Sequence, residues 1–343
     1  MLISIESARQ LCLKVFSTTM GAPDDIAEAA TESLVDASLR GIDSHGILIL
    51  PYYLGRWTAG QIVPSSRPKI VRETGVTTVF DGCQAMGHYT SRTAMQTAIE
   101  RAKDSGMGAA VARNSTHNGA ISLYSIQAAR QGMIGIAATA CAPHVAPFGG
   151  TSGLHGTNPI TYAFPRKDQD PLVFDLSTGY SSAKIKDIAD RDGRLPPDRV
   201  LDSAGKPTTD PADKKDGWIL PVAGHIGFGL GLLVDGLACA LSDGPIGREI
   251  PLVSDKSGAY NGSFFAMAIA PAAFAGTEAF EQRIGSLVGQ IEDHRPQDLE
   301  QPVRWPGQRG WTTRRTRSVE GIPVSDQQWQ NFRDGLKKFD VEP

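Results

Sequence analysis

Two short histidine segments carry the residue types best suited to proton transfer. Asp43, Ser44 and His45 lie in RGIDSHG, and His117 lies in NSTHNGA, each beside glycine and small polar residues. A histidine titrates near neutral pH, so its ring can donate or accept a proton when a carbonyl and an alcohol interconvert. One loop histidine alone is usually a surface residue. Two such loops favour proton transfer, and the sequence leaves open whether His45 or His117 performs it.

Other catalytic classes have less support in the sequence. Gly227, Gly229 and Gly231 are spaced G-x-G-x-G, whereas the Rossmann fingerprint needs G-x-G-x-x-G after a strand, so a tightly packed helix start is favoured. The seven histidines form neither an HExxH pattern nor a close His/Cys cluster, so we expect no metal site. A hydrolase built on Ser44 and His45 is a weaker alternative, because adjacent residues rarely adopt nucleophile–base geometry and no G-x-S-x-G elbow is present.

Composition limits the remaining classes. The chain has 343 residues, 41% of them hydrophobic, which is enough for a sizeable core divided into two or three domains. It has no basic block interleaved with aromatic residues, so a nucleic-acid or anionic-membrane partner is not expected. The one basic cluster, near 308–318, is interpreted as a solvated loop, with contact to a dinucleotide phosphate as the alternative. Four widely spaced cysteines, the absence of a targeting segment and short apolar runs predict a soluble cytoplasmic protein with reduced thiols.

The elements that position the histidine loops can be predicted from the hydrophobic pattern. Two helices occupy the first 40 residues; the second opens at Asp24 and ends at Gly41, immediately before the His45 loop. Strands and helices then alternate irregularly, with several hairpin-like strand pairs, and a last helix lies in the tail. This mixture predicts an α+β architecture with a mixed sheet. The segment 144–159 holds four glycines between two strands and can approach a ligand closely.

Motifs along nearly the whole chain, from about residue 4 to 335, together resemble one family. In order they are RGIDSHGI, LPYY, NSTHNGA, AARQGMIGI, APFGG, GTNPI, VFDLST, LDSAGKPTTDP, HIGFGLGL, NGSFFAMAI and WPGQR. They resemble the malate/L-lactate dehydrogenase-like NAD(P)-dependent oxidoreductases, which lack a Rossmann fold. That family includes malate, sulfolactate and ureidoglycolate dehydrogenases, diketogulonate reductase, and the piperideine- and pyrroline-2-carboxylate reductases.

The resemblance implies a fold, a cofactor and a set of site residues. The expected fold is α+β, with a large, mostly antiparallel mixed sheet and flanking helices. A helical region, 1–70, would pack with the tail 295–343, and a cofactor-binding mixed-sheet region with a helical subdomain would span 71–294. The cofactor would be NAD or NADP, the assembly a homodimer, and the catalytic residues His45, His117 and Ser44. The residues implied in cofactor binding are Cys141, Asp175, Leu176, Ser177, Thr178, Gly224, His225, Pro306, Gly307 and Gln308.

Four departures from the family pattern bear on the substrate. Ile49 stands where an arginine usually follows the SHG turn; Ile226 and Ile185 stand in place of lysines, the latter after Lys184, and Gln308 replaces a glutamate. Losing an arginine removes a carboxylate partner worth ~1.5–3 kcal/mol. We therefore expect a monocarboxylic 2-oxo acid or cyclic 2-imino acid to be preferred over a dicarboxylate, with Arg113 or Lys184 as candidates to hold the carboxylate. The alternative is a catalytically degenerate homologue that only binds a dinucleotide.

Overall fold

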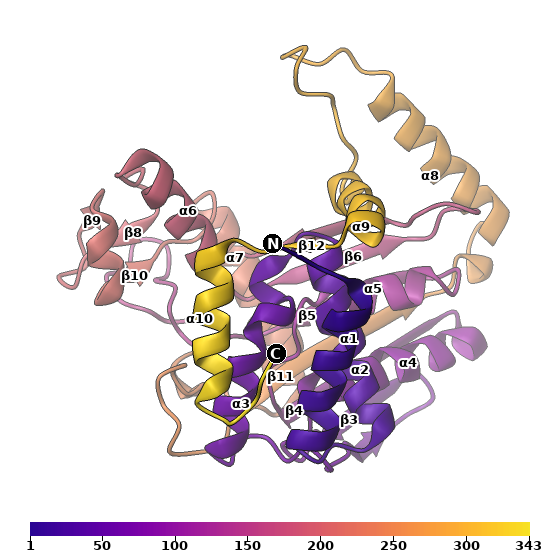
Figure 1. Ribbon diagram of the computed structural model, residues 1–343. Coiled ribbons are helices and arrows are strands. Elements are labelled where there is room, and N and C mark those ends of the chain that lie inside the picture. Colours follow the sequence, from indigo (N-terminus) through magenta and orange to yellow (C-terminus); the bar gives the residue numbers. More distant parts are fainter.

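A seven-stranded mixed sheet forms the centre of the molecule (Figure 1). The structure is a computed structural model that describes the backbone of residues 1–343 and all side chains except those of 182–184, 186 and 187. In the described sheet only β3 and β4 run parallel, and the other neighbours are antiparallel. Its strands, in spatial order, are β2 (Lys69–Glu73), β3 (Thr77–Asp81), β4 (Met107–Ser115), β11 (Gly262–Ile269), β5 (Ile134–Thr139), β6 (Ile160–Phe164) and β7 (Leu172–Leu176).

Small residues allow two helices to lie very close to this sheet. The helices are α4 (Gly87–Ser105) and α5 (Ser122–Ala129), and the core between them and the sheet is rich in alanine. A Cβ on Gly108 of β4 would lie 2.2 Å from the carbonyl oxygen of Ala98. A Cβ on Gly135 of β5 would lie 2.3 Å from the carbonyl oxygen of Ser125. Glycine at these two positions therefore sets the helix–sheet distance, since no larger residue fits.

A helical layer joins the two ends of the chain. It consists of α1 (Ile5–Leu13), α2 (Asp24–Leu39), α3 (Leu50–Thr58) and α10 (Asp326–Lys337). Buried residues between Ile3 and Met86 share one hydrophobic cluster with residues between Ile322 and Val341. The short strands β1 (Leu2–Ile3) and β12 (Ile322–Pro323) pair antiparallel beside it. These contacts join the two ends of the chain, and the division into 1–70 with 295–343 and 71–294 stays a prediction.

Three further parts surround the sheet. A small lobe, on the left of Figure 1, contains α6 (Ser182–Asp192) and the short strands β8 (Val200–Leu201), β9 (Pro207–Thr208) and β10 (Trp218–Ile219). The apolar helix α7 (His225–Val234) continues irregularly to Ser242. Helix α8 (Thr277–Glu292) stands away from the sheet at the upper right, and α9 (Gln308–Glu320) follows it.

The predicted fold class is confirmed, with one local correction. The mixed sheet, its helices and the non-βαβ order agree with the α+β expectation. The segment 308–318, expected to be a solvated loop, is instead most of helix α9. Its arginines carry long aliphatic stems that are compatible with a helix. The charges of Arg314, Arg315 and Arg317 are paired across the fold, a stabilisation that composition alone does not reveal.

Candidate active site

The loop that carries His45 is folded back onto the end of α2. Gly41 takes the left-handed conformation after the helix, with a φ of 75°. The backbone N–H of Ile47 donates to Ser38 Oγ over 2.9 Å, and a Cβ on Gly46 would lie 2.2 Å from that oxygen. Only glycine at position 46 allows this close approach. The tight turn fixes the position of the His45 backbone.

The loop that carries His117 is held by the start of α4. The hydroxyl of Thr116 donates to the carbonyl oxygen of Ala85 and accepts from the N–H of Gly87. A Cβ on Gly87 would lie 2.2 Å from the carbonyl oxygen of Thr116. Asn114, at the end of β4, takes a positive φ of 50°, a conformation that asparagine tolerates better than most residues. The residue that precedes His117 is therefore fixed against the start of α4.

The fold brings the two histidines together. Their rings stack with centroids 5.6 Å apart and an angle of 14° between the planes. Ser44 Oγ lies 2.9 Å from His45 Nδ1, and Tyr53 Oη lies 2.6 Å from His117 Nδ1. Adjacent residues were expected to adopt this geometry only rarely, and here Ser44 and His45 lie in the 3₁₀ turn Asp43–His45 with their side chains in contact.

Both rings are held in the neutral state. Burial lowers the pKa of His45, and the carboxylate of Asp175 acts in the opposite direction. Burial lowers the pKa of His117 well below its usual value, with His45, His88 and Arg56 adding to the effect. Both side chains keep some exposed surface. They are neutral imidazoles that solvent or a small molecule can reach.

Asp175 lies on β7 and connects the histidine pair electrostatically to a buried ionic group. The surrounding protein raises the pKa of Asp175 although the residue keeps an exposed surface, while Ser122, Arg40 and His45 lower it. Arg40 NH1 donates to Ser122 Oγ over 3.2 Å. The Arg40 Nε atom donates to Asp36 over 2.6 Å. Asp175 therefore faces both a catalytic candidate and a fixed cation.

The segment after β7 turns back onto the preceding strand connection. Leu176 is half-buried and pairs with Ile160 on β6. Ser177 Oγ donates to the carbonyl oxygen of Gly179, and Thr178 Oγ1 donates to the carbonyl oxygens of Thr157 and Asn158. The hydroxyls of this segment are thus used to shape the turn.

The start of α7 is attached to the same segment. The N–H of Val222 donates to the carbonyl oxygen of Thr178 over 2.9 Å, and a Cβ on Gly227 would lie 2.5 Å from that oxygen. Gly224 precedes the helix with a φ of 64° and no side chain caps it. His225 is exposed, and its ring contacts Phe148 edge-on.

The glycine series in α7 is only partly a packing feature. Gly227 and Gly231 both contact neighbouring atoms closely, as a packed helix start requires. A Cβ on Gly229, by contrast, would meet no atom within 4 Å. The interpretation as a tightly packed helix start is therefore correct for two of the three glycines.

The Pro306–Gly307–Gln308 turn is fixed on β7. The N–H of Val173 donates to the carbonyl oxygen of Pro306 over 3.0 Å. Gly307 has a φ of 92°, and a Cβ there would lie 2.9 Å from the carbonyl oxygen of Val173. Gln308 Oε1 accepts from the N–H of Trp305 over 3.3 Å. Three implied cofactor segments therefore meet on or beside one strand.

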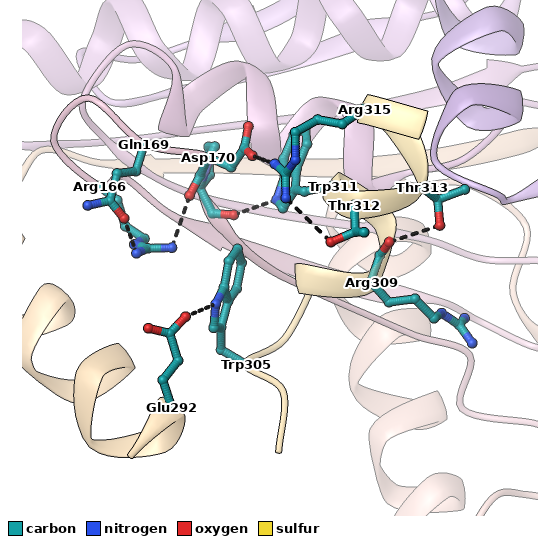
Figure 2. A network of polar contacts seen from close by, with 11 residues as sticks. Arg166, Gln169, Asp170, Glu292, Trp305, Arg309, Trp311, Thr312, Thr313 and Arg315 are labelled. Atoms are coloured by element: carbon teal, nitrogen blue, oxygen red, sulfur yellow. Dashed lines mark hydrogen bonds and ion pairs between the residues drawn. The ribbon is translucent and has the colours of Figure 1, made fainter. Parts of the chain in front are cut away.

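Figure 2 shows the polar network that holds this turn. Trp305 Nε1 donates to Glu292 on α8, and Trp311 Nε1 donates to the carbonyl oxygen of Pro171 just before β7. Arg315 binds Asp170 over 2.6 Å in the same network. Helices α8 and α9 are thereby both tied to the start of β7.

Cys141 lies after β5, beside the glycine-rich segment 144–159. Its N–H donates to Asn158 Oδ1 over 3.0 Å, and a Cβ on Gly156 would lie 2.3 Å from its carbonyl oxygen. Burial raises the pKa of the Cys141 thiol. The side-chain amide of Asn158 donates to Asp235 on the continuation of α7. Cys141 thus lies where the glycine-rich segment and the α7 region meet.

The residues that depart from the family pattern have different surroundings. Ile49 is half-buried and packs against the core of the helical layer, so part of its apolar character belongs to that core. Ile185 is fully buried in the small lobe, and Ile226 is exposed. Arg113 binds Asp243 Oδ2, so it is engaged away from the histidine pair, whereas the side chain of Lys184 lies outside the described residues. The monocarboxylate preference is untested by these positions.

Three of the four arginines of α9 are paired with carboxylates of the same chain. Arg314 binds Asp36, Arg315 binds Asp170, and Arg317 binds Asp43 of the histidine loop. Arg317 also donates to the carbonyl oxygen of Ser38. These pairs tie α9 to α2 and to the His45 loop.

Sequence reasoning missed Tyr53 and His88. Tyr53 lies in the LPYY motif one helical turn after the SHG segment, and the hydrogen bond from its hydroxyl to His117 could not be seen from spacing alone. His88 was only one of seven histidines, yet its Nε2 lies 2.9 Å from the same hydroxyl. Tyr53 and His88 each lie near the start of a helix that borders the site, α3 and α4, and this was the available signal.

Among the residues whose side chains are described, no group of three or more His, Cys, Asp or Glu is placed to hold a metal ion. One helical run, His225–Ser242, is long and apolar enough to cross a membrane, with 18 residues and a mean hydropathy of 1.5. Core and interface helices pass the same test, so a single such helix is weak evidence for a membrane.

Comparisons with known proteins agree along the whole chain. Residues 3–333 match the family described as malate/L-lactate dehydrogenase. The L-sulfolactate dehydrogenase of Methanocaldococcus jannaschii is 34% identical over 298 residues, 86% of each chain. The crystal structure of malate dehydrogenase from Entamoeba histolytica superimposes with a TM-score of 0.93 at 27% identity, covering 100% of this chain and 99% of that one. The Δ1-piperideine-2-carboxylate reductase of Pseudomonas syringae gives 0.86 at 26% identity, covering 98% and 99%.

Proposed function

The chain belongs to the malate/L-lactate dehydrogenase family, and on that premise we propose that it is an NAD(P)-dependent oxidoreductase. It transfers a hydride between the nicotinamide and C2 of a small 2-oxo or 2-hydroxy acid, or of a cyclic 2-imino acid. The observation that carries this proposal is the stacked pair His45 and His117, two neutral imidazoles each with a hydroxyl at Nδ1. A fold alone does not fix a reaction, so the proposal rests on this pair.

Proton transfer is assigned to the histidine pair. A hydroxyl contacts Nδ1 of each ring, which leaves Nε2 of His45 or His117 for the substrate. A positioned imidazole that donates to the substrate oxygen or nitrogen as charge develops there contributes about 10²–10⁴-fold to the rate. Ser44 orients the ring of His45.

The residues along β7 fit a nicotinamide dinucleotide. Gly224 and Gly307 both have positive φ and shape the backbone turns that border this region, and the uncapped start of α7 offers N–H groups that suit a phosphate. Asp175, Leu176, Ser177 and Thr178 line the same region as Cys141, His225, Pro306 and Gln308. When bound, the nicotinamide supplies or accepts the hydride.

The choice between NAD and NADP is left to measurement. The sequence offered Arg314, Arg315 and Arg317 as partners for a 2′-phosphate, and each of them pairs with a carboxylate. This removes the one sequence argument for NADP without excluding it. Dissociation constants for NADH and NADPH, measured by the same fluorescence titration, decide between them.

We further propose a cytoplasmic homodimer. Helix α7 and the segment that follows it expose several large apolar side chains, which would be costly to leave in water and which a second copy would cover. They are Leu232, Leu233, Leu241 and Ile246. Light scattering after size exclusion should give twice the chain mass for the wild type and a smaller mass for Leu233→Asp. A wild-type monomer would contradict the proposed dimer.

The test of the catalytic proposal is absorbance at the reduced-nicotinamide band with a panel of 2-oxo acids and cyclic imines. We expect turnover of at least one panel member, and a 10²–10⁴-fold lower kcat for His45→Asn or His117→Asn with cofactor affinity nearly unchanged. Full activity in both variants would remove the histidine mechanism. Cofactor binding without turnover of any panel member would favour the degenerate homologue, which the comparisons with named enzymes do not support.

A further inference from the structure

We propose that Tyr53 and His88 form, with His117, a proton relay that protonates Nδ1 of His117 from inside the protein as its Nε2 gives a proton to the substrate. This inference rests on the proposed function and decides between the two histidines in favour of His117. Tyr53 Oη lies 2.6 Å from His117 Nδ1 and 2.9 Å from His88 Nε2. Tyr53 and His88 are both fully buried.

A backbone group sets the direction of the hydrogen bonds. The N–H of Gly119 lies 3.3 Å from His117 Nδ1 and can only donate, so Nδ1 carries the lone pair and Nε2 carries the proton. The hydroxyl of Tyr53 must then donate to His117 Nδ1. Its oxygen is free to accept, and His88 Nε2 is the donor that reaches it. The proton of His88 is therefore on Nε2, and its Nδ1 is a bare acceptor.

The acceptor at the end of this chain has no partner among the described residues. His88 Nδ1 is buried without a hydrogen bond, and so are the hydroxyls of Ser33, Thr90 and Ser91 on α2 and α4. A buried polar atom left unpaired costs about 1–3 kcal/mol, and such clusters are where internal water is held. His88 also lines a groove of about 640 Å³ between α2, α4 and α5. The groove brings solvent close to His88, and in this proposal an internal water held among the unpaired hydroxyls completes the connection.

All three groups stay neutral, so each must release one proton as it accepts another. Burial lowers the pKa of His88 to about 3, and it raises the pKa of Tyr53 well above its usual value. His117 is neutral for the same reason. Forming an imidazolium or a phenolate here would be costly, so each group gives one proton as it takes another.

The steps balance for one reduction. The His117 Nε2–H bond breaks as the O–H bond of the product forms. The Tyr53 O–H bond breaks as His117 Nδ1–H forms, and the His88 Nε2–H bond breaks as the Tyr53 O–H bond re-forms. His88 Nδ1 takes a proton from water held between it and the groove. This leaves His117 and His88 protonated on Nδ1, so the exchange runs in reverse after product release: solvent in the emptied site protonates His117 Nε2, and His88 Nδ1 returns its proton to the water. The substrate carbon gains the hydride of the proposed reaction, and the oxygen gains one proton drawn from solvent.

His45 lacks such a connection in the described structure. Its Nδ1 contacts only the hydroxyl of Ser44, a residue that is itself exposed. Tyr53 and His88 touch neither substrate nor cofactor in this scheme, so they are positioning residues that act through His117. A purely structural role for them would hold the ring of His117 without moving protons, and the experiment must separate these two roles.

The decisive variant is His88→Gln, because its amide can still donate to Tyr53 but cannot exchange one proton for another. Steady-state reduction is followed in mixtures of H₂O and D₂O. For the wild type we expect a curved dependence of kcat on the deuterium fraction, which indicates several protons moving together. For His88→Gln and for Tyr53→Phe we expect a straight line, kcat lower by about 10–100-fold and KM changed less than about twofold.

Controls keep the test specific. Thr93→Val alters another groove-lining residue of α4 and should keep both the kcat and the curvature of the wild type. The double variant of Tyr53 and His88 should lose no more than either single variant, because the two residues act in series. Wild-type kcat and curvature in His88→Gln, or in a folded Tyr53→Phe if the former does not fold, would overturn the relay.

A second measurement does not depend on turnover. Nitrogen-15 NMR of the labelled full-length protein reports the tautomer of each histidine ring. We expect His88 and His117 both to be protonated at Nε2 only and to stay neutral between pH 6 and 8. A proton on Nδ1 of either ring would overturn the relay. An inactive wild type with the expected tautomers would contradict the proposed function and not the hydrogen-bond direction.

Discussion

Replacing Asp36 by Asn should destabilise the protein strongly. The carboxylate of Asp36 accepts from Arg40 Nε over 2.6 Å and also binds Arg314, so it neutralises two cations. The side chains of Asp36 and Arg40 are only 8% and 6% exposed. Removing one partner of a buried pair leaves an uncompensated charge, which costs about 3–5 kcal/mol. Arg314 is 33% exposed, so water compensates part of its loss, and we expect the lower end, about 3 kcal/mol.

The assay is urea unfolding of the wild type and the variant at one fixed protein concentration, since association changes apparent stability. Glu32→Gln is the matched control. Glu32 lies one helical turn before Asp36 on α2 and binds Arg92, but both side chains of that pair are about half exposed (48% and 49%). Its loss should cost no more than about 1 kcal/mol.

The comparison of the two variants refutes or supports the reasoning directly. If Asp36→Asn lowers the free energy of unfolding by no more than Glu32→Gln does, the burial of the Asp36 carboxylate has no energetic consequence. Because Arg40 also faces Asp175, a destabilised Asp36→Asn variant should also lose cofactor affinity if Asp175 borders the cofactor. Unchanged cofactor affinity in the folded variant would place that site away from Arg40.

Three further predictions concern the substrate, the pH and a turn. Ile49→Arg should raise the kcat/KM of oxaloacetate relative to pyruvate by about 10–100-fold, the worth of one charge-assisted hydrogen bond; lost stability with an unchanged ratio would assign Ile49 to the core. Burial lowers the pKa of His88 to about 3, whereas a histidine in the unfolded chain titrates near 6.5. The unfolded chain therefore takes up the proton first, and the free energy of unfolding falls as the pH drops below 6.5, by up to about 1.4 kcal/mol per pH unit. His88→Gln should flatten the urea-unfolding free energy between pH 6.5 and 5, and the exposed His294→Gln should not; equal slopes would contradict this. Gly307→Ala, at a φ of 92°, should cost about 1–3 kcal/mol and weaken NADH binding, while Gly285→Ala in α8, with open space around it, should be neutral or stabilising by calorimetry.

The periodic elements could be predicted from sequence because their causes are local. Ser4 caps α1, Gly41 ends α2 and Gly106 ends α4, and each of these depends on a few neighbouring residues. The strands β4 and β11 follow from runs of small and β-branched residues. The segment 308–318 was assigned wrongly because the partners of its arginines, such as Asp36 and Asp170, lie far away in the chain.

The composition of the site was likewise available from sequence, but its geometry was not. His45 and His117 were selected by residue type and by their glycine-flanked loops. Nothing in the spacing shows that the rings stack 5.6 Å apart, because β4 and the end of α2 meet only through packing of the sheet against the helical layer. Adjacent residues rarely adopt nucleophile–base geometry, yet Ser44 Oγ and His45 Nδ1 are in contact within a 3₁₀ turn.

Sequence by itself determined the elements, the family motifs and the residue types that can move a proton. Tertiary structure alone decided which of those residues meet. Tyr53 and His88 are 35 positions apart and were not selected, yet the phenol lies between two imidazoles. The physical reason is range: caps, turns and periodicity act over about four residues, whereas burial and hydrogen-bond partnership depend on segments that only the folded chain brings into contact.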